Sequence, residues 1–215
     1  MNNPFNALLK DKGWDGSLAQ TEGDYLYVVN SNLGGTKANY FVKNKMTYEI
    51  VSMTRDGLLR ANLYLDYSHT GKDSAWPGGP YKDYLRVITQ NGSKLTGAKI
   101  VRDSESEDIF KNVIISKEGL YNTFELGFTL EPAKNLRVVL NYDLPQNLSA
   151  TKDSKNYTLL WQKQPGTDGD QFVFIFNPPF GMTPQSYSKD LKLTDNVLNN
   201  EGFLNTNLNY FVELQ

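Results

Sequence analysis

The chain of 215 residues carries 22 basic and 24 acidic side chains, a formal net charge of -2, and no cysteine. Without a surplus of basic residues, general nucleic-acid binding is not expected, and without cysteine the sequence excludes disulfides, thiolate catalysis and cysteine-ligated metals. Hydrophobic residues make up only 39% of the chain, but 13 tyrosines and 11 phenylalanines can fill a core. The length suits one folded domain.

The first segment predicts a short helix. Asn3 is a favourable N-cap, Pro4 suits the first helical position, and Gly13 can end the helix in the left-handed conformation. We expect residues 1–22, this helix and a linker, to pack on a β-sandwich domain formed by residues 23–215, so that the whole chain is a single domain.

Most of the remaining sequence alternates between apolar and polar residues with a period of two, which is typical of half-buried strands. The clearest runs lie at 40–50, 59–67, 124–130, 136–142 and 204–214, and residues 171–177 are apolar on both faces, as in a central strand. Residues 178–200 are rich in proline and predict an irregular segment. The pattern predicts an all-β fold, an antiparallel β-sandwich (Ig-like or jelly-roll-like) of about nine or ten strands with a short N-terminal helix.

Two stretches combine strand-like runs with turn residues, and each predicts a hairpin. One spans residues 157–177, with "PGTDGD" as its turn, and the other spans residues 26–42, with residues 32–36 at its tip. In the second stretch Gly34 and Gly35 can supply the positive φ of a tight tip.

The residues that follow this tip have either a structural role or a role in ligand binding. Tyr40 is in phase with the apolar face of the next strand, so we expect it to enter the core. Asn39 and Lys37 take the other phase, where Asn39 can bond neighbouring backbone and Lys37 can pair with an acid such as Asp24. On this interpretation Asn39→Ala mainly lowers stability, and the alternative is that Lys37 and Asn39 bind a ligand.

Candidate catalytic and metal sites are few. His69 is the one histidine, no G-x-S-x-G motif accompanies it, and a loop-anchoring or exposed role fits it better than catalysis. Zinc is not expected with one histidine and no cysteine. Asp168 and Asp170 lie in a glycine turn, as in calcium loops, but the closing glutamate is missing and a plain turn fits better. We predict no metal site and no cofactor.

Aromatic residues in or near loops give the most plausible binding chemistry. Aromatic faces stack on the C–H groups of sugars, and asparagine or aspartate side chains bond the hydroxyls. Trp76, Tyr81 and Tyr84 could form such a platform, and the alternative is that these rings fold over the end of the sandwich. The full set of candidate binding residues is Trp76, Tyr81, Tyr84, Arg86, His69, Lys37 and Asn39.

Four segments occur in an order that resembles a known family. They are "GWDGSL" (13–18), "GDYLYVVNSNLGGTKANYFVKNKMTYEI" (23–50), "GPYKDYLRV" (79–87) and "YTLLWQKQPGT" (157–167). Together they resemble the C-terminal part of bacterial proteins grouped as the domain of unknown function 4012 family. The resemblance covers roughly residues 8–170, and it departs from the family at "TQNGSKL" (89–95).

This resemblance implies an extracytoplasmic, C-terminal module at the bacterial cell surface, a fragment of a membrane-anchored protein. It implies no catalytic residues, because the family has none assigned, and it agrees with a role near envelope polysaccharide. The segment itself shows no stretch of roughly 20 apolar residues that could enter a membrane.

Three functions remain open on the sequence. The first is a noncatalytic module of a bacterial envelope protein with a structural or interaction role, whose partner is a polysaccharide or another envelope protein. The second is a carbohydrate-binding module for envelope or extracellular polysaccharide. The third is an enzyme that acts on glycan through two carboxylates.

Overall fold

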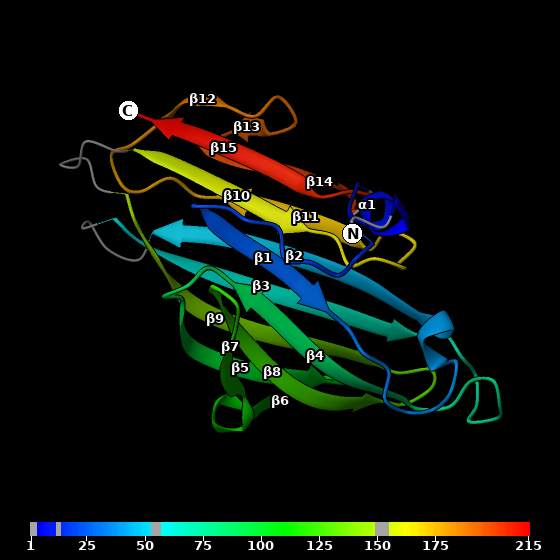
Figure 1. Ribbon diagram of the computed structural model, residues 1–215. Coiled ribbons are helices and arrows are strands. Elements are labelled where there is room, and N and C mark those ends of the chain that lie inside the picture. Colours follow the sequence, from blue (N-terminus) through cyan, green and yellow to red (C-terminus); the bar gives the residue numbers. More distant parts are fainter. Residues whose placement is uncertain (1–3, 12–13, 53–56, 149–154) are drawn as a thin grey trace.

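The computed structural model describes residues 4–11, 14–52, 57–148 and 155–215 and is mostly β (Figure 1). Within these residues one α-helix, two short 3-10 turns and fifteen strands occur, more strands than the sequence predicts. In chain order they are α1 (Pro4–Asp11), β1 (Asp24–Val29), η1 (Ala38–Phe41), β2 (Val42–Ser52), β3 (Leu58–His69), β4 (Tyr81–Thr89), β5 (Lys94–Arg102), β6 (Glu105–Asp108), η2 (Phe110–Asn112), β7 (Ile114–Glu118), β8 (Tyr121–Leu130), β9 (Asn135–Asn147), β10 (Asn156–Gln162), β11 (Gln171–Phe176), β12 (Pro184–Tyr187), β13 (Lys192–Thr194), β14 (Val197–Phe203) and β15 (Leu208–Leu214).

The strands form two sheets. One has seven strands in the order β12-β15-β10-β1-β4-β8-β7, and the other has eight in the order β13-β14-β11-β2-β3-β9-β5-β6. Residues 178–200 contribute β12, β13 and the start of β14, so the expectation of an irregular segment is wrong. Short edge strands of three or four residues carry too few alternations to be recognised by their period.

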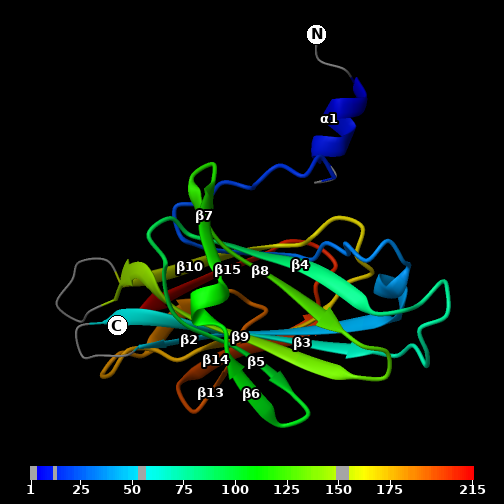
Figure 2. The same cartoon turned by 90° about the horizontal axis from the view of Figure 1, so that it is seen from below.

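The two sheets lie face to face, as two layers in Figure 2. Their inward side chains form one large core, in which the Tyr48 ring of β2 meets the Trp161 ring of β10 with centroids 5.8 Å apart. The predicted inward sets on β3, β8 and β9 are confirmed, because every second residue of these strands is buried. In these three strands the alternation in the sequence therefore identifies the core face correctly.

The sheets are mixed, which corrects the prediction of purely antiparallel pairing. β1 runs parallel to β10 in the first sheet, and β2 runs parallel to β11 in the second. All other strand pairs in the described part of the chain are antiparallel.

Both predicted hairpins are wrong for one reason. The chain leaves β1 in the first sheet and enters β2 in the second, and it does the same from β10 to β11. We call residues 30–41 the first crossing and residues 163–170 the second crossing. Glycine and proline turns permit a change of sheet as readily as a tight hairpin, and the local sequence does not specify the partner strand.

The parallel pairs place the two crossings side by side at one end of the molecule. β1 and β10 are neighbours where the crossings begin, and Gln171 of β11 pairs with Lys45 of β2 where they end. The Gln164 side chain joins them, because it accepts a hydrogen bond from Asn30 N–H and donates one to the Asn30 carbonyl, both at 3.0 Å. At this end of the molecule the two crossings are therefore hydrogen-bonded to each other.

The N-terminal segment has two parts. The predicted helix is confirmed at Pro4–Asp11, while its expected cap residues Asn3 and Gly13 lie outside the described residues. Figure 2 shows α1 away from the sheets, whereas the linker lies on the seven-stranded sheet, where Tyr121 donates to the Ala19 carbonyl. The division at residue 22 stays a prediction. No helix among the described residues is long and apolar enough to cross a membrane.

Candidate functional site

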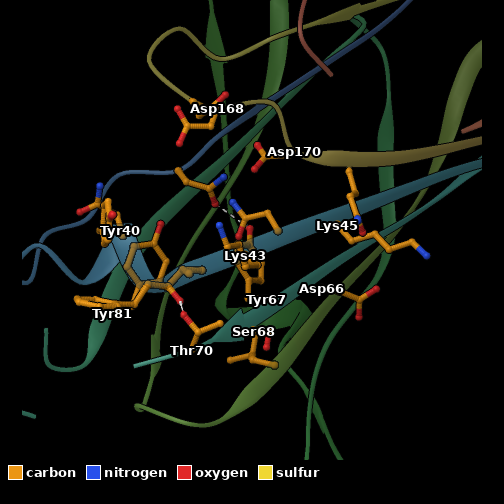
Figure 3. Close-up of a pocket in the computed structure, with 18 of the residues that line it drawn as sticks. Tyr40, Lys43, Lys45, Asp66, Tyr67, Ser68, Thr70, Tyr81, Asp168 and Asp170 are labelled. Atoms are coloured by element: carbon orange, nitrogen blue, oxygen red, sulfur yellow. Dashed lines mark hydrogen bonds between the residues drawn. The ribbon is translucent and has the colours of Figure 1, made fainter. Parts of the chain in front are cut away.

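An open groove of about 1490 Å³ lies at the end of the sheets where the two crossings run. Its lining comes from both crossings, from the start of β2 and from the end of β3, with further residues from the neighbouring strand ends (Figure 3). The lining is rich in amide and hydroxyl side chains: Asn30, Asn32, Asn39, Asn44, Asn135, Gln164, Gln171, Thr36, Thr70, Thr167 and Ser68.

The start of β2 gives the groove two kinds of side chain. β2 begins at Val42, but its neighbour β11 reaches it only at Lys45, so the residues before Lys45 lack a strand on that side. Lys43 and Lys45 are exposed on one face of β2, and Asn44 between them is half-buried on the other. The groove thus combines cationic side chains with amides.

The first crossing is held by its own asparagine. The Asn32 Oδ1 atom accepts from Gly34 N–H at 2.9 Å, and Asn32 Nδ2 donates to the Thr36 carbonyl at 2.8 Å. Gly35 has a φ of +67°, as expected for a tight turn, whereas Gly34 does not lie in that region. These hydrogen bonds lie within the first crossing itself, so they hold this part of the groove wall in place in addition to the neighbouring strands.

Asp83 ties the first crossing to β4. Its Oδ1 atom accepts from Ser31 N–H at 2.7 Å and from the Tyr81 hydroxyl at 3.0 Å, while its buried Oδ2 atom has no partner. Burial raises the pKa of Asp83 to about 6, against the lowering effect of the bonds from Tyr81 and Ser31. Beside this carboxyl, the Tyr67 hydroxyl donates to Asn30 Oδ1 at 2.8 Å, and both tyrosines line the groove.

The second crossing supplies the two aspartates that the sequence offers as metal ligands. Figure 3 shows Asp168 and Asp170 on this crossing, above the start of β2. Burial raises the pKa of Asp170, and Lys163 opposes that shift. No group of three or more histidine, cysteine, aspartate or glutamate side chains within the described ranges could hold a metal ion.

The predicted role of Tyr40 is wrong. Its ring is 80% exposed and lines the groove, because η1 at Ala38–Phe41 interrupts the strand phase before β2 begins. Asn39 is also exposed and lines the groove, with one long hydrogen bond of 3.4 Å from Asn32 Nδ2. A strand period extrapolated across a helical turn assigns the wrong face.

Lys37 and Trp76 lie together on neighbouring loops. The Lys37 Nζ atom is 6.0 Å from the centroid of the Trp76 ring, which is 77% exposed. The proposed pair of Lys37 with Asp24 is wrong, because Asp24 is fully buried and accepts hydrogen bonds from Tyr48 and Tyr157 instead.

The remaining candidate residues lie on different faces. Tyr81 points inward from β4 and is 3% exposed, whereas Tyr84 and Arg86 take the opposite phase and contact Glu125 and Glu118 on the outer face. The structure therefore does not bring Trp76, Tyr81 and Tyr84 together as one platform. His69 is buried, and both its ring nitrogens bond the loop that follows β3.

Of the amides that line the groove, the sequence identifies Asn39 as a candidate binding residue but not the others. Asn30, Asn44 and Gln164 lie 14 to 134 positions apart in the chain and meet only because both crossings pass the same end. The one signal available was the density of asparagine in residues 30–44, which alternation alone assigns to a solvated strand face.

Comparisons with known proteins show a shared fold only. No family model and no curated protein sequence matches the chain. Among solved structures, a protein described as nutrient-binding from Legionella pneumophila matches with a TM-score of 0.53 and 8% identity over 89% of this chain and 71% of its own. This likeness concerns the fold alone.

Two weaker matches are hydrolases. An M1 zinc metallopeptidase of Deinococcus radiodurans matches with a TM-score of 0.34 and 11% identity, over 80% of this chain and 42% of that enzyme. A yeast LTA4 hydrolase matches with a TM-score of 0.39 and 9% identity, over 84% of this chain and 29% of that enzyme. The chain spans less than half of either enzyme, and neither match supports an argument about function.

Proposed function

We propose that this chain is a noncatalytic, extracytoplasmic module of a bacterial envelope protein, and that its groove binds carbohydrate. The proposal combines the envelope role implied by the resemblance to the domain of unknown function 4012 family with the second of the functions left open by the sequence. The two-sheet body serves as a β-sandwich scaffold, on which loops at one end carry the binding groups.

The observation that carries the proposal is the chemistry of the groove. Amide and hydroxyl side chains supply donors and acceptors, as sugar hydroxyls require. Tyr40 adds an exposed aromatic ring to the same lining, and such a ring can stack on the apolar face of a sugar. Binding sites typically combine a few placed polar groups with aromatic surface in this way.

A noncatalytic role agrees better than glycan hydrolysis with the position of the acidic groups. Asp168 and Asp170 belong to one turn, two residues apart, whereas a glycosidase needs two carboxylates that flank the scissile bond. The other two acidic residues in the lining are also paired: Asp66 accepts from Arg137 at 2.6 and 3.0 Å, and Asp103 accepts from Lys134 Nζ at 2.9 Å. We therefore assign these carboxylates to shape and hydrogen bonding.

The direct test is Tyr40→Ala on an array of bacterial envelope glycans. We expect affinity to fall by at least about tenfold, as for an aromatic group at the centre of an interface, with no change in melting temperature because the ring is exposed.

Tyr84→Ala is the matched control, because Tyr84 lies on the outer face of the seven-stranded sheet. Loss of binding in the Tyr84 variant with full binding in the Tyr40 variant would place the site elsewhere.

A further inference from the structure

Trp76 is an exposed ring on a fixed loop. The side chain is 77% exposed, although tryptophan usually buries most of its large apolar surface. Ala75 N–H donates to Asp73 Oδ1 at 3.0 Å, and Gly78 N–H donates to the Ala75 carbonyl at 2.9 Å. The loop around the ring is thus internally bonded, and its exposed ring calls for an explanation.

His69 closes this loop at both of its ends. Its Nδ1 atom accepts from Gly71 N–H at 3.0 Å, and its Nε2 atom lies 2.9 Å from the Gly79 carbonyl. Because a carbonyl can only accept, the bond to Gly79 requires hydrogen on Nε2, and this leaves Nδ1 free to accept. The buried imidazole therefore links residues 71 and 79, and we call this pair of hydrogen bonds the clasp. The imidazole ring is parallel to the Phe41 ring of η1, with the two centroids 6.3 Å apart.

The same loop is bonded to the first crossing. Lys37 N–H donates to the Pro77 carbonyl at 2.9 Å, and its Nζ atom lies over the Trp76 ring. Thr70 donates to the Phe41 carbonyl at 2.7 Å through both its N–H and its hydroxyl. Tyr40 N–H in turn donates to the Lys37 carbonyl at 3.0 Å. Lys37 therefore connects the loop of Trp76 to the turn that carries Tyr40.

We infer that Trp76 and Tyr40 are two contacts of one extended site, so that the ligand is a carbohydrate chain of several rings and not a single terminal sugar. The inference rests on the proposed function of the groove. Tyr40 lines the groove, whereas Trp76 does not. The hydrogen bonds of Lys37 to Pro77 and to Tyr40 join the loop of Trp76 to the turn that carries Tyr40, so the exposed Trp76 ring extends the site beyond the groove. His69 is a positioning residue that fixes the Trp76 loop and does not contact the ligand.

The test measures affinity against chain length. Native protein, Trp76→Ala and Trp14→Ala are titrated with the monomer, trimer and hexamer of N-acetylglucosamine, whose amide and hydroxyl groups suit the lining. We expect the native protein to gain affinity with length, and the gain from monomer to hexamer to shrink by about tenfold in Trp76→Ala, as for a lost aromatic contact. Trp14 is 64% exposed on the N-terminal linker and serves as the matched control.

A second variant tests the clasp. His69→Phe keeps an aromatic ring beside Phe41 but removes both hydrogen bonds. We expect faster amide exchange at Gly71 and the same reduced gain with chain length as in Trp76→Ala. Unchanged exchange at Gly71, or an unchanged length dependence, would show that His69 does not position the loop.

The outcomes separate the two proposals. If the native protein binds none of the oligomers, the carbohydrate role of the groove fails for this class, and the extended site fails with it. If the native protein binds them but Trp76→Ala keeps the full gain with length, or shows the same gain as Trp14→Ala, the extended site alone is wrong.

Discussion

Two buried aspartates on the seven-stranded sheet have similar acidity and different surroundings. Asp24 on β1 accepts from the hydroxyls of Tyr48 and Tyr157 and from Tyr25 N–H, at 2.6 to 2.8 Å. Asp83 on β4 accepts through Oδ1 only, while its Oδ2 atom has no partner. Burial is the first cause that raises the pKa of each to about 6.

The two aspartates therefore have different roles: Asp24 holds the sheets together, whereas Asp83 holds a segment that lines the groove. Tyr48 belongs to the eight-stranded sheet and Tyr157 to the seven-stranded sheet, so Asp24 bonds the two layers inside the core. Asp83 bonds the first crossing, which lines the groove. A completely satisfied buried carboxylate fixes the arrangement of the sheets, whereas the incompletely satisfied one lies where loops form the site.

Of all the proposed variants, Asp24→Ala is expected to lower the free energy of unfolding most. It leaves two buried hydroxyls and one backbone N–H without their acceptor, and we expect the free energy of unfolding to fall by about 3–5 kcal/mol. Denaturant unfolding measures this directly.

The control is Asp66→Ala, which removes a partly exposed ion pair with Arg137 and should cost less than about 1 kcal/mol. Equal losses in the two variants would mean that Asp24 does not bond the sheets as described.

The two buried carboxyls should also make stability depend on pH. Ionisation of each one lowers the free energy of unfolding, by less than the loss expected for Asp24→Ala. Each has a folded-state pKa of about 6 against an ordinary value of 3.8, so its contribution to stability is complete below about pH 4 and is lost as pH rises through 6. We expect a loss of about 2–3 kcal/mol per carboxyl between these limits.

Asp83→Asn isolates one of the two groups, because the amide keeps an acceptor for Ser31 and Tyr81 but does not titrate. The free energy of unfolding of the native protein minus that of the variant should decrease from pH 4 to pH 7, because only the native protein ionises at this position. A constant difference over that range would contradict the burial of an ionising Asp83.

Asn39→Ala should have the smallest effect on stability. The sequence predicts a loss of stability, but the side chain is exposed and its hydrogen bond from Asn32 is long, so we expect the free energy of unfolding to change by no more than about 0.5 kcal/mol. Thermal unfolding of this variant beside the native protein is sufficient. A larger loss would assign Asn39 to the structural group with Asp24.

The sequence predicts faces of strands better than their partners. The alternation in β3, β8 and β9 marks the buried residues correctly, since burial follows the period within one strand. The partner strand depends on contacts far away in the chain, and for this reason both crossings resembled hairpins.

The candidate site was predicted less well for a related reason. The apolar period assigns Tyr40 to the core, because η1 leaves no mark on that period. Asp24 gave no sign of burial, since its partners Tyr48 and Tyr157 lie 24 and 133 residues away. Side chains that act together here come from separate segments, and one sequence does not show which segments meet.

We propose that the groove binds carbohydrate, whereas the core around Asp24 is structural. The most direct measurement is an NMR titration of the native protein with the hexamer of N-acetylglucosamine. We expect amide shifts in the first crossing, the start of β2 and the second crossing, with none at β12 and β13. Shifts confined to β12, β13 or the outer face around Tyr84 would contradict this proposal.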